Sequence, residues 1–171
     1  MKNDRIKNIV TGGAIAGLYV LLTLVSFAFG LSGGAVQIRF SEALCILPVF
    51  TPSAVPGLFA GCVLANIITG CALPDIIFGS LATFFGALGT RVLRNQALGE
   101  GKKVSGTAAA LLPPVLLNTV IVTALQVFVY GIKAGWLLIA LSVFAGEFIS
   151  CIVFGWFLKK FVSDNRQKLG I

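Results

Sequence analysis

The sequence predicts an all-α integral membrane protein, a bundle of six transmembrane helices forming a single domain over residues 1–171. The mean hydropathy is +1.00, and only 11% of the residues are charged, against about 25% in an ordinary soluble domain. The apolar residues occur in long uncharged runs, whereas a soluble protein would show periodic stripes facing one core. The bilayer is therefore the solvent in which each segment has to be interpreted.

The first three spans are predicted from uncharged runs and the prolines that divide them. Residues 9–29 follow a basic start and supply the roughly 20 apolar residues that a helix needs to cross the hydrocarbon. No charge occurs from residue 43 to residue 74, but Pro48, Pro52 and Pro56 interrupt this stretch. Since proline restricts its own backbone and that of the preceding residue, two short or broken spans are expected, at residues 41–50 and 55–70.

The last three spans have clearer boundaries. Asp75 opens the fourth span directly after Pro74, which suits a first helical turn, and Arg91 and Arg94 close it. The fifth and sixth spans are predicted at residues 107–130 and 136–158, joined by a short glycine-containing turn. The aromatic residues at that turn, Tyr130 and Trp136, are expected to lie at the membrane interface.

The basic residues predict the orientation of the bundle, since cytoplasmic ends of membrane proteins are rich in Lys and Arg. Alternation of six spans leaves only Arg39 and Lys133 on one side. The other side receives Lys2, Arg5, Lys7, Arg91, Arg94, Lys102, Lys103, Lys159, Lys160, Arg166 and Lys168. Both termini are therefore predicted to be cytoplasmic.

Several function classes lack their sequence signatures. The chain has no G-x-x-x-x-G-K-[ST] phosphate loop, no histidine and no G-x-S-x-G elbow, which argues against ATP hydrolysis by that route and against an enzyme in general. No cofactor or metal site is expected, because the four cysteines stand singly in apolar stretches and are expected to pack as small hydrophobic residues. The basic residues are not grouped on an aromatic-bearing soluble face, so nucleic acid is not an expected partner.

Three acids remain in or at the predicted membrane region: Glu42, Asp75 and Glu147. A charged side chain at the bilayer centre costs about 2.5 to 3.5 kcal/mol on insertion scales, so such residues generally face a cavity or a partner. In the six-span arrangement, polar residues are expected to converge at an outward-facing mouth. These candidate binding residues are Gln37, Arg39, Glu42, Asn66 and Asp75. The alternative interpretation is an interfacial pair of Arg39 with Glu42, with Asp75 as a helix cap.

A second polar pair is expected deeper in the bundle. Asn118 and Glu147 lie fifteen and fourteen residues from Lys133, which places both about 21 to 22 Å below that turn. They are expected to be close enough to touch, either to join two helices or to contact a ligand. Gln126 lies higher on the same predicted helix and is a weaker candidate for the cavity.

Gly13 and Gly17 are spaced four residues apart on one face of the first span. Small residues at this spacing let another helix approach closely. That helix belongs either to a partner subunit or to the same chain.

Residues 37–44 (QIRFSEAL), 55–66 (VPGLFAGCVLAN) and 75–83 (DIIFGSLAT) resemble the QueT family of queuosine-precursor transporters. The resemblance covers nearly the whole chain. It implies a six-helix substrate-binding S component of an energy-coupling factor (ECF) transporter in the bacterial plasma membrane. Such a component docks on a coupling transmembrane protein and two ATP-binding subunits. A small-xxx-small motif on its first helix contacts the coupling protein, and Gly13 and Gly17 occupy that place.

The implied ligand is queuine or a deazaguanine precursor of queuosine. A carboxylate can accept hydrogen bonds from the ring N–H and the exocyclic amine of such a ring, and either Glu42 or Asp75 is expected to take this role. Asn66 can bond along the same edge, and Arg39 can donate to the ring carbonyl. Phe40 or Trp136 can offer a stacking face.

Two other functions stay open at this point. A proton-coupled secondary transporter of a small polar nutrient would use one of the three acids to couple uptake to a proton gradient. A helper subunit of a larger membrane complex would use its polar residues for assembly and would bind no ligand.

Overall fold

In the computed structural model, residues 2–31, 37–99 and 104–165 are described, and every regular element within them is helical. Within these ranges, seven α-helices are interspersed with one 3-10 helix, η1, and three π-helical segments, η2 to η4. In chain order they are α1 (Lys2–Ala28), η1 (Phe40–Val49), α2 (Ala54–Ile68), η2 (Asp75–Gly79), α3 (Ser80–Val92), α4 (Arg94–Leu98), α5 (Ser105–Ala124), η3 (Leu125–Val129), α6 (Trp136–Glu147), η4 (Phe148–Phe154) and α7 (Gly155–Asp164).

Among the described residues, three continuous helices are long and apolar enough to cross a membrane. They cover Asp4–Ala28, Ser105–Val129 and Trp136–Asp164, with 25, 25 and 29 residues. At 1.5 Å per residue each exceeds the roughly 30 Å of a hydrocarbon core. They correspond to the first, fifth and sixth predicted spans. The predicted fourth span corresponds to η2 followed by α3.

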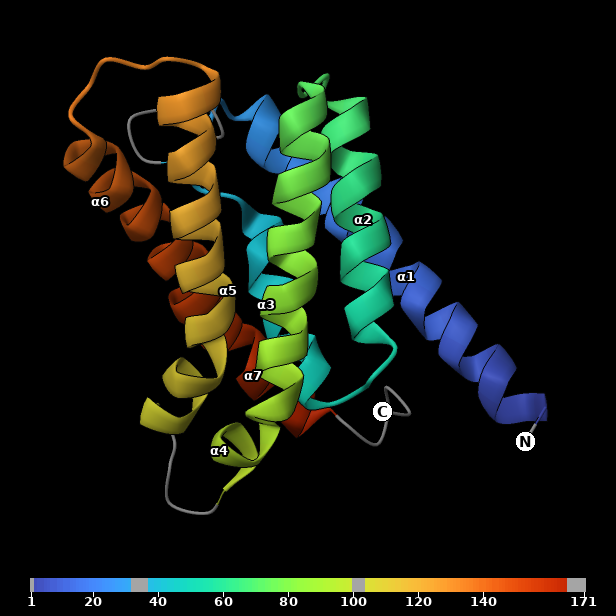
Figure 1. Ribbon diagram of the computed structural model, residues 1–171. Coiled ribbons are helices and arrows are strands. Elements are labelled where there is room, and N and C mark those ends of the chain that lie inside the picture. The colour runs from blue at the N-terminus through green and yellow to red at the C-terminus, as the bar shows by residue number, and fades with distance from the viewer. Residues whose placement is uncertain (1, 32–36, 100–103, 166–171) are drawn as a thin grey trace.

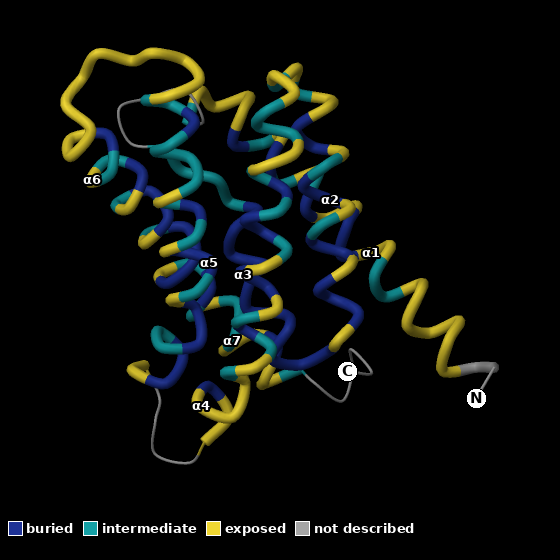
Figure 2. The backbone as a smooth tube through the Cα atoms, viewed as in Figure 1, coloured by how far each residue is buried: buried dark blue, intermediate teal, exposed yellow. Residues whose placement is uncertain are grey.

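The 3-10 helix η1 lies at the centre of the bundle (Figure 1), and the tube is dark blue along it in Figure 2 because residues 41–49 are all buried. Its ten residues span about 20 Å at 2.0 Å per residue, which is less than the hydrocarbon thickness. The structure therefore places a short helix at the predicted second span. This helix packs against α1, α3, α7 and η4. Arg91 covers its end, donating to the carbonyls of Pro48 (3.0 Å) and Val49 (3.4 Å).

The helices α1 and α2 approach closely because small residues face one another. A Cβ added to Gly57 would lie 2.6 Å from the Gly12 carbonyl oxygen, and one added to Gly61 would lie 2.9 Å from that of Ala16. These distances are too short for any side chain larger than glycine. The chain thus contains a small-residue helix pair of its own, formed by Gly12 and Ala16 on α1.

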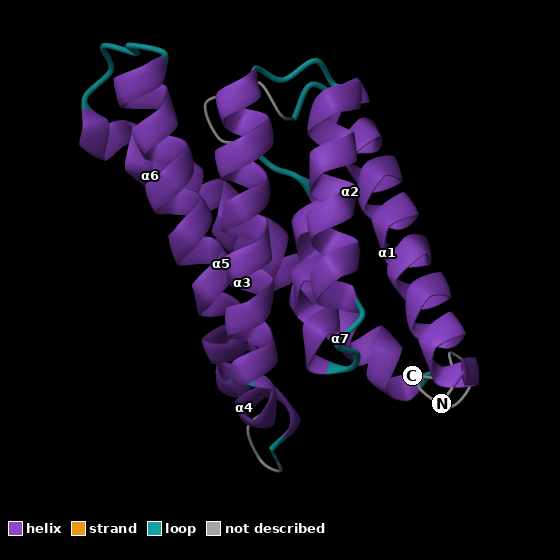
Figure 3. Ribbon diagram, turned by 45° about the vertical axis from the view of Figure 1, so that its right-hand side comes forward, coloured by secondary structure: helices purple, strands orange, loops and turns teal. Residues whose placement is uncertain are grey.

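The start of α1 and the end of α7 lie at the same end of the bundle (Figure 3). The loop between η3 and α6 lies at the opposite end. The assignment of the first end to the cytoplasm remains a prediction from the basic residues. Four of these, Lys102, Lys103, Arg166 and Lys168, lie outside the described residues.

Candidate binding site

Glu42, Asn118 and Glu147 form a buried polar cluster between η1, α5 and α6. Their exposed fractions are 2%, 4% and 9%. The Asn118 Nδ2 donates to Glu147 Oε2 at 3.2 Å and to Glu42 Oε2 at 3.5 Å. The expected contact between Asn118 and Glu147 is therefore present. Glu42 joins this deeper pair, whereas the sequence placed it at the mouth with Asn66 and Asp75.

Three further donors surround the two acids, and the sequence interpretation had missed all of them. The Tyr19 hydroxyl of α1 donates to Glu42 Oε1, and the Cys45 thiol donates to Glu42 Oε2 at 3.3 Å. The Cys151 thiol donates to Glu147 Oε2 at 3.6 Å. Cys45 follows Glu42 by three residues and Cys151 follows Glu147 by four, and helical spacing puts such pairs on one face. That spacing was the available signal, so these thiols do more than pack as hydrophobic groups.

Two cavities lie at or near this cluster. The inner one has a free volume of about 20 Å³. It is lined by Gln37, Arg39, Glu42, Gly79, Thr83, Asn118, Val122, Val143 and Glu147. The outer one has a volume of about 250 Å³. It is lined by Thr23, Phe27, Gly30, Arg39, Asn66, Thr69 and Cys71. Arg39 lines both cavities, which are therefore neighbours, whereas the three cluster residues line only the inner one.

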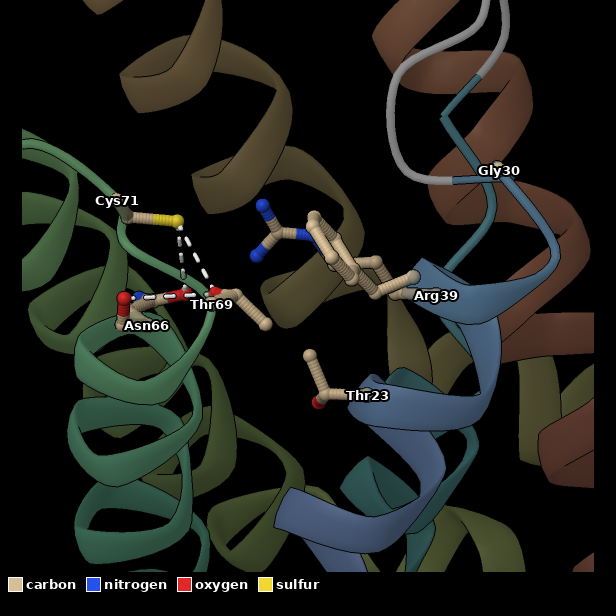
Figure 4. Close-up of a pocket in the computed structure, with 7 residues that line it drawn as sticks. Thr23, Gly30, Arg39, Asn66, Thr69 and Cys71 are labelled. Carbon is tan, nitrogen blue, oxygen red and sulfur yellow. Dashed lines mark hydrogen bonds between the residues drawn. The ribbon is translucent and has the colours of Figure 1, made fainter.

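The backbone around Arg39 is fixed from two sides. The Arg39 N–H donates to Ser150 Oγ of η4 at 3.1 Å, and the Phe40 N–H donates to Ser26 Oγ of α1 at 2.8 Å. The Arg39 side chain extends into the outer cavity toward Thr69 and Cys71 (Figure 4). Within the described residues its guanidinium forms no hydrogen bond and no ion pair, so the expected alternative pairing with Glu42 is not seen.

Asn66 lies on the opposite wall of the outer cavity, at the end of α2. Its Nδ2 donates to the Asp75 carbonyl oxygen at 3.4 Å. Its Oδ1 accepts from the Cys71 thiol at 3.9 Å, and both residues are drawn in Figure 4. The Asp75 carboxylate, in contrast, accepts a hydrogen bond from the exposed Tyr130 hydroxyl. This hydrogen bond raises the pKa of Tyr130 to about 12. The structure thus brings Asn66 to the cavity and ties the Asp75 side chain to the surface.

The remaining candidates separate into two groups. Gln37 lines the inner cavity. Trp136 is 67% exposed at the start of α6, and Gln126 is partly buried in η3; neither is among the described residues that line the two cavities. The Phe40 ring packs against the Phe154 ring, with centroids 5.5 Å apart.

An apolar groove of about 440 Å³ runs along α1 and α2 near the end where α1 begins. Gly13 lines it, together with Pro56 and Ala60 of α2. Gly13 and Gly17 are both exposed, and a Cβ added to either would meet nothing within 4 Å. The small residues that pack within the chain are thus their neighbours Gly12 and Ala16, which leaves Gly13 and Gly17 unused inside the described structure.

Comparison with known proteins identifies relatives of this chain. A family model described as "QueT transporter" matches residues 9–164. The chain is also similar to the queuosine precursor transporter QueT of Lactococcus lactis subsp. cremoris (strain MG1363). The two are 33% identical over 89 residues, which cover 52% of this chain and 53% of that relative. The alignment therefore spans about half the length of the relative. No solved structure gives a significant match.

Proposed function

The chain belongs to the QueT transporter family, and we propose that it binds a queuosine precursor, either queuine or a smaller deazaguanine, outside a bacterial plasma membrane for import. The protein is then a multi-pass membrane subunit with six spans and cytoplasmic termini. It acts as the S component of an ECF transporter. It supplies selectivity, and partner subunits supply energy.

The observation that carries this proposal is the outer cavity of about 250 Å³ beside a buried polar cluster. Ligand pockets usually hold about 300 to 1,000 Å³ and combine apolar walls with a few polar groups. A deazaguanine ring presents N–H donors on one edge next to a carbonyl acceptor. Carboxylates match the donors and the Arg39 guanidinium matches the carbonyl. The site therefore has the chemical groups that this ligand requires.

The groove along α1 and α2 supports the proposed coupling to partners. Gly13 lines this apolar groove, and a Cβ added to Gly13 or to Gly17 would meet nothing within 4 Å. This open face of α1 permits close approach of a helix from another subunit. We assign this surface to the coupling transmembrane protein, which in turn joins two ATP-binding subunits. The absence of a phosphate loop from the sequence is in keeping with an external source of ATP hydrolysis.

The proposal is tested by the thermal stability of the detergent-purified protein with a ligand panel, because a ligand that binds the folded state raises its melting temperature. The panel contains queuine, its deazaguanine precursors, guanine and common vitamins. We expect selective stabilisation by the deazaguanines. Stabilisation by an unrelated vitamin would contradict the proposed substrate. No response to any ligand would favour the alternative of a helper subunit.

Proton-coupled secondary transport is the second candidate, because two acids lie buried in one cluster and such acids often carry protons in transporters. It is distinguished by uptake in cells. Uptake that stops when a protonophore removes the gradient while ATP remains would favour this candidate. Uptake that requires the ATP-binding subunits would favour the S component.

A further inference from the structure

The two acids of the buried cluster differ in how many of their carboxyl oxygens accept hydrogen bonds from the protein. Both oxygens of Glu42 accept hydrogen bonds, from Tyr19 at Oε1 and from Cys45 and Asn118 at Oε2. The Glu147 Oε2 is similarly occupied, by Asn118 and Cys151. The Glu147 Oε1 accepts no hydrogen bond from the described residues. Glu147 therefore keeps an acceptor atom available to a ligand, whereas both oxygens of Glu42 are occupied.

The position of Glu147 also favours contact with a ligand. Glu147 is 9% exposed and Glu42 only 2%, although both line the inner cavity. The preceding residue, Gly146, lies against the Gln37 carbonyl so closely that an added Cβ would collide with it. This glycine lets the segment that carries Arg39 pass directly over α6. Arg39 and Glu147 are thus held in the same cavity wall by a backbone contact.

The size of the inner cavity defines how a ligand can reach it. Its free volume of about 20 Å³ is enough for roughly one water molecule and far too small for a bicyclic ring. The outer cavity of about 250 Å³ has room for the ring. A bicyclic ligand that reaches the cluster would therefore have to lie mainly in the outer cavity, with one polar edge inserted past Arg39.

We propose that Glu147 contacts the donor edge of the ligand directly through Oε1, that Arg39 contacts the carbonyl, and that Glu42 is a positioning residue. Glu42 fixes Asn118 and Tyr19 and through them joins α1, η1 and α5 around the site. This inference rests on the proposed function. It selects one acid from the two that share the cluster, and it predicts that the exocyclic amine of the ring is recognised by Glu147.

The experiment compares two ligands that differ by one donor: 7-deazaguanine and 7-deazahypoxanthine, which lacks the exocyclic amine. Dissociation constants are measured by calorimetry for the wild type and for the nearly isosteric variants Glu147→Gln and Glu42→Gln. Glu147→Gln replaces one of the two carboxyl oxygens with an amide NH₂ group, which donates hydrogen bonds and does not accept them. The remaining oxygen is needed by Asn118 and Cys151, so the variant has no free acceptor for the exocyclic amine. We therefore expect a preference for 7-deazaguanine of about tenfold or more in the wild type and of about threefold in Glu147→Gln.

The Glu42→Gln variant provides the contrast. We expect it to lower the melting temperature of the ligand-free protein and to weaken both ligands by a similar factor, so that the preference stays at the wild-type value. The Asp164→Asn variant, at an exposed position at the end of α7, is the control and should change neither affinity. Folding of each variant is checked by size-exclusion chromatography.

The outcomes separate this inference from the proposed function. The preference for 7-deazaguanine could instead be lost in Glu42→Gln and kept in Glu147→Gln. That result would mean that Glu42 contacts the ligand and Glu147 is the positioning residue, and it would overturn the inference but not the proposed function. An unchanged preference in both variants would also overturn it, while binding by the wild type would leave the proposed function intact. A wild-type protein that binds neither compound would contradict both the inference and the proposed function.

Discussion

At the scale of single residues, the site depends on polar side chains that satisfy one another inside an apolar bundle. Tyr19 is 1% exposed and donates to Glu42, which is 2% exposed. A buried acceptor that loses its donor carries the cost of desolvation without compensation, about 1 to 3 kcal/mol. The pair therefore matters more for stability than a comparable contact at the surface.

The substitution Tyr19→Phe is expected to lower the free energy of unfolding by about 1 to 3 kcal/mol, because it leaves Glu42 Oε1 without a donor. Thermal unfolding followed by circular dichroism measures the change. Tyr130→Phe is the matched control, since Tyr130 is 42% exposed and its hydroxyl can be replaced by water. Equal losses in the two variants would contradict the role assigned to the buried pair.

Tyr130 itself allows a test by titration. Its hydrogen bond to the Asp75 carboxylate raises its pKa from 10.0 to about 12. Because the contact requires the protonated phenol, its stabilising effect is complete below about pH 10 and is lost as the pH rises through about 12. In the Tyr19→Phe background Tyr130 is the remaining tyrosine, so its phenolate absorbance can be followed alone. We expect Asp75→Asn to move this titration toward pH 10.0, and an unchanged midpoint would exclude the contact.

At the scale of elements, long apolar helices could be predicted from the sequence and the short central helix could not be predicted in full. Residues 9–29, 107–130 and 136–158 have the composition of spans, and all of them except Phe29 and Tyr130 lie in long helices of the structure. For η1 the prolines indicated a short segment, but its burial on all sides depends on neighbours far apart in the chain. The contact of Asn118 with Glu147 followed from counting residues, whereas the inclusion of Glu42 required the packing of η1.

The glycine pairs between α1 and α2 lead to an expectation for this element. Gly57→Ala should destabilise the fold by about 1 to 3 kcal/mol, since its Cβ would lie 2.6 Å from the Gly12 carbonyl oxygen. Gly13→Ala should leave the melting temperature unchanged or raise it slightly, because its Cβ would meet nothing within 4 Å and alanine favours a helix. Thermal unfolding of both variants in one detergent is the measurement. A larger loss in Gly13→Ala would show that the packing face has been assigned to the wrong glycine.

At the scale of the whole molecule, the candidate binding site and the open groove share no lining residue among those described. The inner cavity lies where η1, α5 and α6 meet, and the outer cavity is lined by Thr23 and Phe27 of α1 and by Asn66 of α2. The groove is lined by earlier positions of the same two helices, between residues 8 and 16 and between residues 53 and 60. The sequence predicted both sets of residues only in part. Gly13 and Gly17 were identified by their spacing, but their exposure could be known only after Gly12 and Ala16 were found to face α2.

This separation predicts that binding and accumulation can be uncoupled by one substitution. Gly13→Leu adds a bulky side chain to the groove without touching the two cavities, so the purified variant should bind the deazaguanine ligand as the wild type does. If the groove receives the coupling protein, the same variant should abolish accumulation in cells that contain all partner subunits, because the close approach of a partner helix is blocked. Ligand titration and cellular uptake are measured in parallel, with Leu18→Ala, an exposed change on the same helix outside the groove, as the control. Normal uptake by Gly13→Leu would mean that the partner subunits dock elsewhere, and lost binding would mean that the groove and the site are not independent.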